Sequence, residues 1–174
     1  MKKPALFLIL SCAVLFACSC ARPRQEEAEK KGQPQAEYKN LKADEYAIPE
    51  KLKETLPGLV NDKIRIWKEI SPTVNLVAYF PDYSLEKAVK QASEAFLILR
   101  EDPNFKNGID FWIIQIQPEE GPQLLVWGVR PSEAEQFAQS KELKAFFRDS
   151  EYVLVNDQII EKGDARLKYL APGK

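Results

Sequence analysis

The sequence predicts an α+β fold: a mainly antiparallel sheet of up to six strands with two helices, in the order ββαββαββ. Three observations predict it. Segments with the two-residue alternation of strands occur in pairs, and short turns join the members of each pair. Between the pairs, apolar residues twice recur at the spacing of a helix. Two amphipathic helices beside one sheet form an α+β layer.

The first predicted hairpin comprises residues 63–70 and 74–80. In the first segment (KIRIWKEI), Ile64, Ile66 and Ile70 fall on one side of a strand and should face the helices. The second segment (VNLVAYF) is rich in β-branched and aromatic residues, which favour strands. Because the Ser-Pro-Thr turn between them is short, the two strands should run antiparallel.

Two helices are expected between the hairpins. Residues 85–99 place apolar side chains on one helical face and charged side chains around the other, and Ser84 is a suitable N-cap. The second helix should follow a capping box formed by Ser132 and Glu135. Ser140 is a candidate cap for a second helical piece that carries Leu143, Phe146 and Phe147.

The remaining strands form two further hairpins. Residues 109–117 (IDFWIIQIQ) are apolar on both faces and are joined through PEEGP to residues 123–130 (QLLVWGVR). The last hairpin pairs residues 152–155 with 158–161 around an Asn-Asp turn.

Composition excludes several classes of function. The chain has 174 residues, a net charge of −1 and no histidine. Such a chain has no broad positive field for nucleic acid and no polybasic stretch for an anionic membrane. Without histidine, Ser-His-Asp and Cys-His catalysis and His-containing zinc sites are excluded. We therefore expect no cofactor, no metal site and no identifiable catalytic residue, and an enzyme is not favoured.

Residues 1–17 predict a cleaved signal peptide. Two lysines precede an apolar run from residue 5 to residue 17 that only Ser11 interrupts. The run has the length of a signal-peptide core and is short for a membrane span, which takes roughly 20 residues. An ordinary secretory signal cut after Ala17 and an uncleaved membrane helix are the alternatives.

The run ends in Leu15-Phe16-Ala17-Cys18. This resembles the lipobox of bacterial lipoproteins, in which an aliphatic residue and a small residue precede an obligatory cysteine. The resemblance implies a diacylglyceryl group on Cys18, cleavage before it and, in many bacteria, acylation of the new amine. Two or more chains anchor a protein stably, whereas one is marginal. Cys20 is a weaker rival lipidation site.

Ser19 follows Cys18, and by resemblance to Gram-negative lipoproteins this favours the outer membrane, facing the periplasm. The inner membrane and the cell surface stay open. Residues 18–40 comprise the lipidated cysteine and a disordered tether, because the segment is almost all charged or polar and cannot bury enough apolar surface to fold. Cys20 is then the one thiol outside the lipid anchor, whether unpaired, acylated or paired between molecules.

The rest of the chain divides into three parts. Residues 41–58 should form an arm that packs on the domain, with Leu52 and Leu56 on one helical face. Residues 59–165 are expected to form a single α+β domain, and residues 166–174 a C-terminal tail.

Two helices can cover one face of the sheet, so the arm, a partner chain or a ligand must cover the other. Trp67 stands between charged residues and should be exposed, and Tyr79 should share its face. Trp112 and Trp127 are further interface candidates, unless they are core residues beneath the arm. Tryptophan and tyrosine are enriched at interface hot spots.

These observations favour a lipid-anchored cell-envelope protein whose non-catalytic domain binds another envelope protein or supports an assembly. The alternative is a domain for a small ligand or a glycan, with the same aromatic residues as a stacking platform. A hydrolase that uses carboxylates alone is a less favoured third. The sequence identifies neither the partner nor the oligomeric state.

Overall fold

A computed structural model describes residues 42–121 and 124–170 of the chain. These residues belong to one compact unit. The elements in chain order are β1 (Asp44–Tyr46), α1 (Glu50–Thr55), β2 (Ile64–Ile66), β3 (Thr73–Phe80), α2 (Leu85–Glu101), α3 (Pro103–Lys106), β4 (Phe111–Pro118), β5 (Leu125–Val129), α4 (Pro131–Ser140), α5 (Leu143–Asp149), β6 (Tyr152–Val155), β7 (Gln158–Ile159) and the 3₁₀ helix η2 (Asp164–Leu170).

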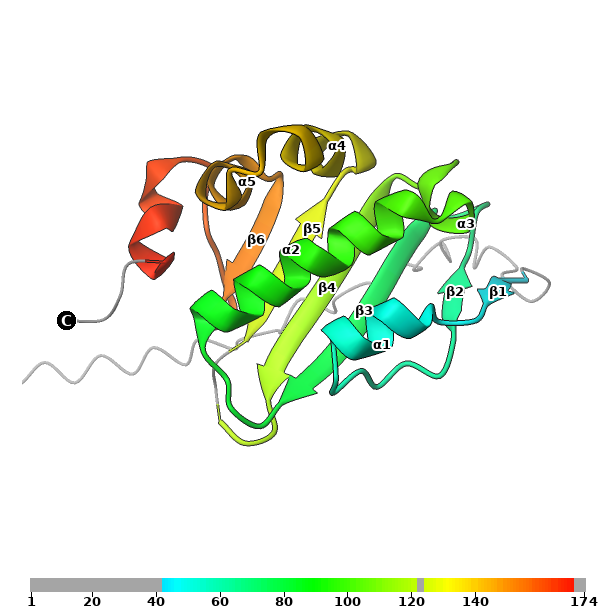
Figure 1. Cartoon of the computed structure of the whole chain (residues 1–174), viewed down its shortest axis with the longest axis horizontal. Helices are drawn as coiled ribbons and strands as arrows, with labels where there is room; N and C mark the ends of the chain where they lie inside the picture. Colours follow the sequence, from blue (N-terminus) through cyan, green and yellow to red (C-terminus); the bar gives the residue numbers. More distant parts are fainter. Residues whose placement is uncertain (1–41, 122–123, 171–174) are drawn as a thin grey trace, which may run out of the picture. The chain divides into compact units, whose positions relative to one another are not determined.

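The fold is α+β, as predicted, but its strands are arranged differently. A five-stranded mixed sheet has the order β3-β4-β5-β6-β7, and β1 and β2 form a separate antiparallel pair. Helix α2 crosses one face of the larger sheet, and α1 lies beside it on the same face (Figure 1). Helices α4 and α5 pack against α2.

The first predicted hairpin is wrong. β2 ends at Ile66 and pairs with β1, and the carbonyl of Trp67 accepts a hydrogen bond from the amide of Ser71 at 2.9 Å, which turns the chain early. Ile70 therefore lies in a turn and is 53% exposed instead of facing the helices. β3 pairs with β4, and the two strands are parallel because α2 carries the chain back to the end where β3 began.

The outer edge of β3 is partly covered by residues 58–61. The carbonyl of Gly58 accepts from the amide of Tyr79 at 2.9 Å, and the side-chain amide of Asn61 donates to the carbonyl of Asn75 at 3.1 Å. A Cβ at position 58 would stand 1.6 Å from the carbonyl oxygen of Tyr79, so only glycine allows this approach. An edge strand that would otherwise expose its backbone groups is thereby protected.

The first predicted helix is confirmed as α2. The side chain of Ser84 accepts from the amide of Lys87 at 3.2 Å, which is the N-cap contact that the sequence predicts. Its apolar face is buried and includes Ala92, Phe96 and Leu99.

The predicted second helix starts differently. Its expected second piece, with Leu143, Phe146 and Phe147, forms as α5, but the N-cap is Glu142 and not Ser140. The capping box is wrong: Pro131 opens α4, and the carboxylate of Glu133 accepts from the amide of Arg130 at 2.7 Å. Glu135 instead pairs with Arg100 of α2 at 3.2 Å. Lys141 adopts a left-handed conformation, with φ of 59°, and separates α4 from α5. The last hairpin forms as predicted, between β6 and β7.

The fold continues past the predicted boundary at residue 165. The Arg166 side chain is buried, and its guanidinium donates to the carbonyls of Phe147 at 3.2 Å and of Ile160 at 2.9 Å. It also donates to the carbonyl of Ser150, just beyond α5. A cation in this position satisfies carbonyl groups that the end of a helix leaves unpaired. Residues 166–170 are thus integral to the fold and are not a tail.

The segment expected as an arm contributes β1 and α1. Leu52 and Leu56 are fully buried in the core, and α1 packs against α2. The segment therefore lies on the helical face of the sheet (Figure 1). It does not cover the other face, contrary to one of the expectations from the sequence.

Candidate functional site

The two faces of the larger sheet have different surroundings. On the face under α2, β4 and β5 direct Trp112 and Trp127 into the core, where neither has any exposed surface. The indole nitrogen of Trp112 donates to the carbonyl of Phe105 at 2.8 Å, and the ring of Trp127 packs edge-on against Phe96 and Phe147. These two interface candidates are core residues, and it is helices that cover them.

We call the opposite side the open face. Among the described residues, the helices labelled in Figure 1 lie on the other side of the sheet. Strand alternation and register place the following residues on the open face: Thr73, Asn75, Val77, Tyr79, Phe111, Ile113, Gln115, Gln117, Val126, Gly128, Tyr152, Leu154 and Ile159.

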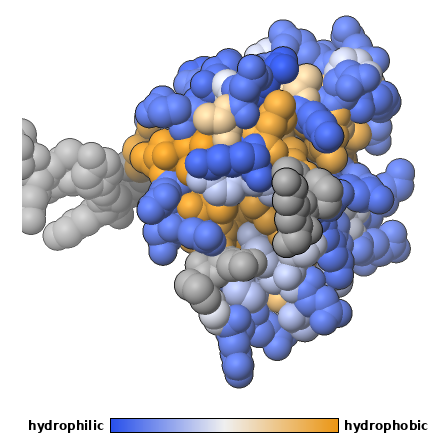
Figure 2. Space-filling model, turned by 90° about the vertical axis from the view of Figure 1, so that its left-hand side faces the viewer, coloured by the Kyte–Doolittle hydropathy of each residue, from blue (hydrophilic) through white to orange (hydrophobic). Residues whose placement is uncertain are grey.

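None of the residues of the open face is charged, although 29% of the chain is charged. The amide side chains lie on β3 and β4, whereas apolar side chains occur on all five strands. Figure 2, which views the molecule from the left-hand side of Figure 1, shows a band of hydrophobic residues bordered by hydrophilic ones. Ile159 of β7 is 66% exposed. Exposed apolar surface without charge is typical of a face that another molecule covers.

The open face is hollowed at one end. A hollow of about 700 Å³ lies over Asn75, Ile113, Gly128 and Tyr152, which the register places in one row across four strands. A Cβ at Gly128 would stand 3.4 Å from the Tyr152 side chain, which is the lower limit of ordinary contact.

An ion pair borders the hollow. The guanidinium of Arg130 donates to the carboxylate of Glu151 at 2.9 Å and lies 4.6 Å from the centre of the Phe111 ring. The hydrogen bond from Arg130 lowers the pKa of Glu151. These two opposite charges make the pair neutral as a unit.

The two exposed aromatic candidates do not lie together. Trp67 is 43% exposed and is bonded through its backbone to Ser71, which lines the hollow. Tyr79 is 37% exposed and lies near the far end of β3. From residue 73 to residue 79 a strand spans about 20 Å. Trp67 therefore lies beside one end of the open face and Tyr79 at the other.

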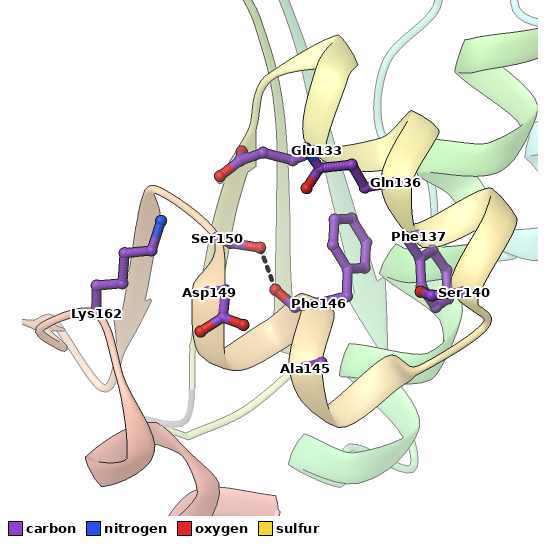
Figure 3. A pocket seen from close by; sticks show the side chains of 9 residues that line it. All are labelled: Glu133, Gln136, Phe137, Ser140, Ala145, Phe146, Asp149, Ser150 and Lys162. Carbon is purple, nitrogen blue, oxygen red and sulfur yellow. Dashed lines mark hydrogen bonds between the residues drawn. The ribbon is translucent and has the colours of Figure 1, made fainter.

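A second hollow, of about 310 Å³, lies between α4 and α5 (Figure 3). Glu133 and Asp149 both line it, and Lys162 lies across from them. Burial raises the pKa of Glu133, whereas the hydrogen bond from Arg148 lowers the pKa of Asp149. Both carboxylates have local partners, since Glu133 accepts from the amide of Arg130 and Asp149 from Arg148 at 2.7 Å.

The anchoring residue, Cys18, lies outside the described residues. Within residues 42–121 and 124–170, no group of His, Cys, Asp or Glu side chains is placed to hold a metal ion. In the same ranges, none of the helices combines the length and the apolar composition that a membrane span requires.

Comparison with protein-family models, with curated proteins and with solved structures found no match to this chain. The sequence identified some residues of the open face and its border and missed others. The aromatic residues of β3 and of the turn after β2 were found from strand alternation. Phe111, Tyr152 and the amide side chains of the open face were missed, because their alignment depends on how β3, β4, β5 and β6 pair across the sheet.

Proposed function

We propose that this protein is a lipid-anchored lipoprotein of the bacterial cell envelope and that its domain binds another protein through the open face. The binding proposal rests on the composition and exposure of the open face. It has no helix over it among the described residues, no charge and several partly exposed apolar side chains.

The anchor rests on the leader. Two lysines, an apolar run and Leu15-Phe16-Ala17-Cys18 occur in the order found in bacterial lipoproteins. Acyl chains on Cys18 would hold the domain at the membrane surface, since each buried CH₂ contributes about 0.8 kcal/mol. The charged segment that follows would separate the domain from the bilayer by on the order of 25 Å.

A protein partner fits the open face better than a small ligand does. The face extends across five strands, and its apolar residues reach the last strand of the sheet. Ligand sites are usually concave and enclose most of the ligand. The hollow over Ile113 and Gly128 is only part of this surface.

A neutral ligand such as a glycan is the second candidate. Tyr152 and Phe111 line the hollow with Asn75 and Gln115, which combines aromatic rings with amide groups. Direct binding of envelope glycans to the purified protein, lost in Tyr152→Ala, would support this candidate over a protein partner. The carboxylate-only hydrolase has less support, because Glu133 and Asp149 are engaged in local contacts.

The anchor is tested by weighing the intact mature protein. We expect the added mass of a diacylglyceryl group and acyl chains on a chain that begins at Cys18. The variant Cys18→Ser should lack this mass and should keep its leader, because cleavage before Cys18 follows lipidation. Cys20→Ser is the matched control and should carry the mass on a cleaved chain; if it does not, the lipid is on Cys20.

Binding is tested with a photo-crosslinking amino acid at position 152 of the full chain, in intact envelopes. The control position is Gln139, which is exposed on α4. We expect discrete protein adducts from position 152 and few from position 139. Equal yields from the two positions would contradict binding through the open face. Trp67 lies beside the end of the open face that is hollowed. Trp67→Ala should therefore reduce the adducts if the partner reaches past that end of the face.

A further inference from the structure

We infer that the partner of the open face is a second copy of this chain, packed sheet against sheet. This inference rests on the proposed function, because it names the protein that the face binds. Two sheets pack face to face when their inner faces carry apolar side chains that interdigitate. In a two-fold dimer the same surface serves both partners, so the surface must be compatible with itself.

The absence of charge meets the first condition for self-association. A charged residue near a two-fold axis meets its own copy, and like charges in contact cost several kcal/mol. The described residues of the open face include no Asp, Glu, Lys or Arg. The nearby pair of Arg130 and Glu151 is neutral as a unit.

The polar groups meet the second condition. Asn75, Gln115 and Gln117 carry amides, and Thr73, Tyr79 and Tyr152 carry hydroxyls, so each side chain can both donate and accept a hydrogen bond. Such groups can pair with their own copies without leaving donor against donor. Lysine, arginine and ionised carboxylates cannot do so.

The chain's own tether is a poor occupant of this face. The residues that follow Cys18 include Glu26, Glu27, Glu29, Lys30 and Lys31. Placing these side chains on an uncharged, partly apolar face would remove their hydration without providing ionic partners. A second copy of the face imposes no such cost.

The size of the face predicts a weak dimer. Five strands spaced about 4.8 Å apart and about six residues of 3.3 Å each give a flat area of about 400 Å². Side-chain relief adds to this value, but a standard stable interface takes about 800 Å² from each partner. Confinement of two tethered copies to one membrane would raise their local concentration and favour the pair.

The test uses the full mature chain with two different tags, co-expressed, and the photo-crosslinker at position 152. We expect an adduct that carries both tags. The added variant Gln115→Glu keeps the shape of the side chain but places a carboxylate in the middle of the face, and should lower the doubly tagged adduct by about tenfold or more. Gln139→Glu, with the same chemical change on exposed α4, should leave the adduct within about twofold of the parent.

The outcomes separate the inference from the proposed function. Adducts from position 152 that never contain both tags would overturn the second copy and leave binding to another protein standing. Absence of protein adducts from position 152 would overturn both. A doubly tagged adduct that Gln115→Glu and Gln139→Glu change equally would show that the copies meet elsewhere, and would also overturn the inference. Thermal unfolding of both variants checks that the fold is intact.

Discussion

Ile113 and Ile114 are neighbours in β4, yet they lie in different environments. Ile114 faces α2 and is fully buried, and its partner in β5 is Trp127, which is buried as well. Ile113 faces the open side, is partly exposed and pairs with Gly128. Both look alike in the sequence, where β4 is apolar on both faces. The difference teaches that, among the described residues, the helical layer covers only one of the two apolar faces of β4 and leaves the other partly exposed.

The largest expected effect comes from truncating this pair of isoleucines one at a time. Ile114→Ala should lower the free energy of unfolding by about 2–5 kcal/mol, because it leaves a cavity beneath α2. Ile113→Ala should lower it by less than about 1.5 kcal/mol, since its side chain is partly in solvent. Urea unfolding of the full chain measures both. Equal losses would mean that the open face is covered within the monomer.

Substitution of Arg166 measures how much η2 contributes to the stability of the helical layer. Arg166→Met should lower the free energy of unfolding by about 2–3 kcal/mol, because buried carbonyls of Phe147 and Ile160 lose their donors. Arg148→Met removes a partly exposed cation from the same region and should cost less than about 1 kcal/mol. If the two variants unfold alike, η2 does not support the helical layer.

The smallest effect concerns pH and the hollow between α4 and α5. Because burial raises the pKa of Glu133 in the folded state, its carboxyl stabilises the fold below its ordinary pKa of 4.5. That contribution is lost as the pH rises through the raised folded value. Glu133→Gln keeps an acceptor for the amide of Arg130 and does not ionise. The variant should therefore gain stability relative to the parent between pH 4 and pH 7, as measured by thermal unfolding across that range.

A gain at low pH instead of high pH would contradict the raised pKa of Glu133. Glu135→Gln, on the same helix, is the control substitution: it removes an ion pair with Arg100 and should lower the free energy of unfolding by less than about 1 kcal/mol.

Local patterns in the sequence predicted the elements that depend on near neighbours. Ser84 begins α2 as expected because its cap contact is with Lys87, three residues away. The turn at Asn156 and Asp157 forms as expected because both residues adopt positive φ, which these residue types tolerate.

Pairing between distant segments could not be predicted in the same way. The alternation in residues 63–70 is compatible with β3 or with β1 as a partner, and the chain forms the second pair. Helix α4 begins at Pro131, with Ser132 inside its first turn, because proline is suited to the first helical position. Which face of β4 the helices would cover depended on the crossover through α2. The crossover also determined that Trp112 and Trp127 lie in the core, which their neighbours in the sequence do not indicate.

We expect the open face to be covered by protein in the native envelope. Hydroxyl-radical footprinting of Tyr152 measures this most directly, with Tyr169 of η2, which lies on the helical side, as the internal reference. We expect Tyr152 to be protected at least severalfold in intact envelopes relative to the dilute, detergent-purified chain, while Tyr169 is modified equally in both. Equal modification of Tyr152 in the two preparations would contradict the account.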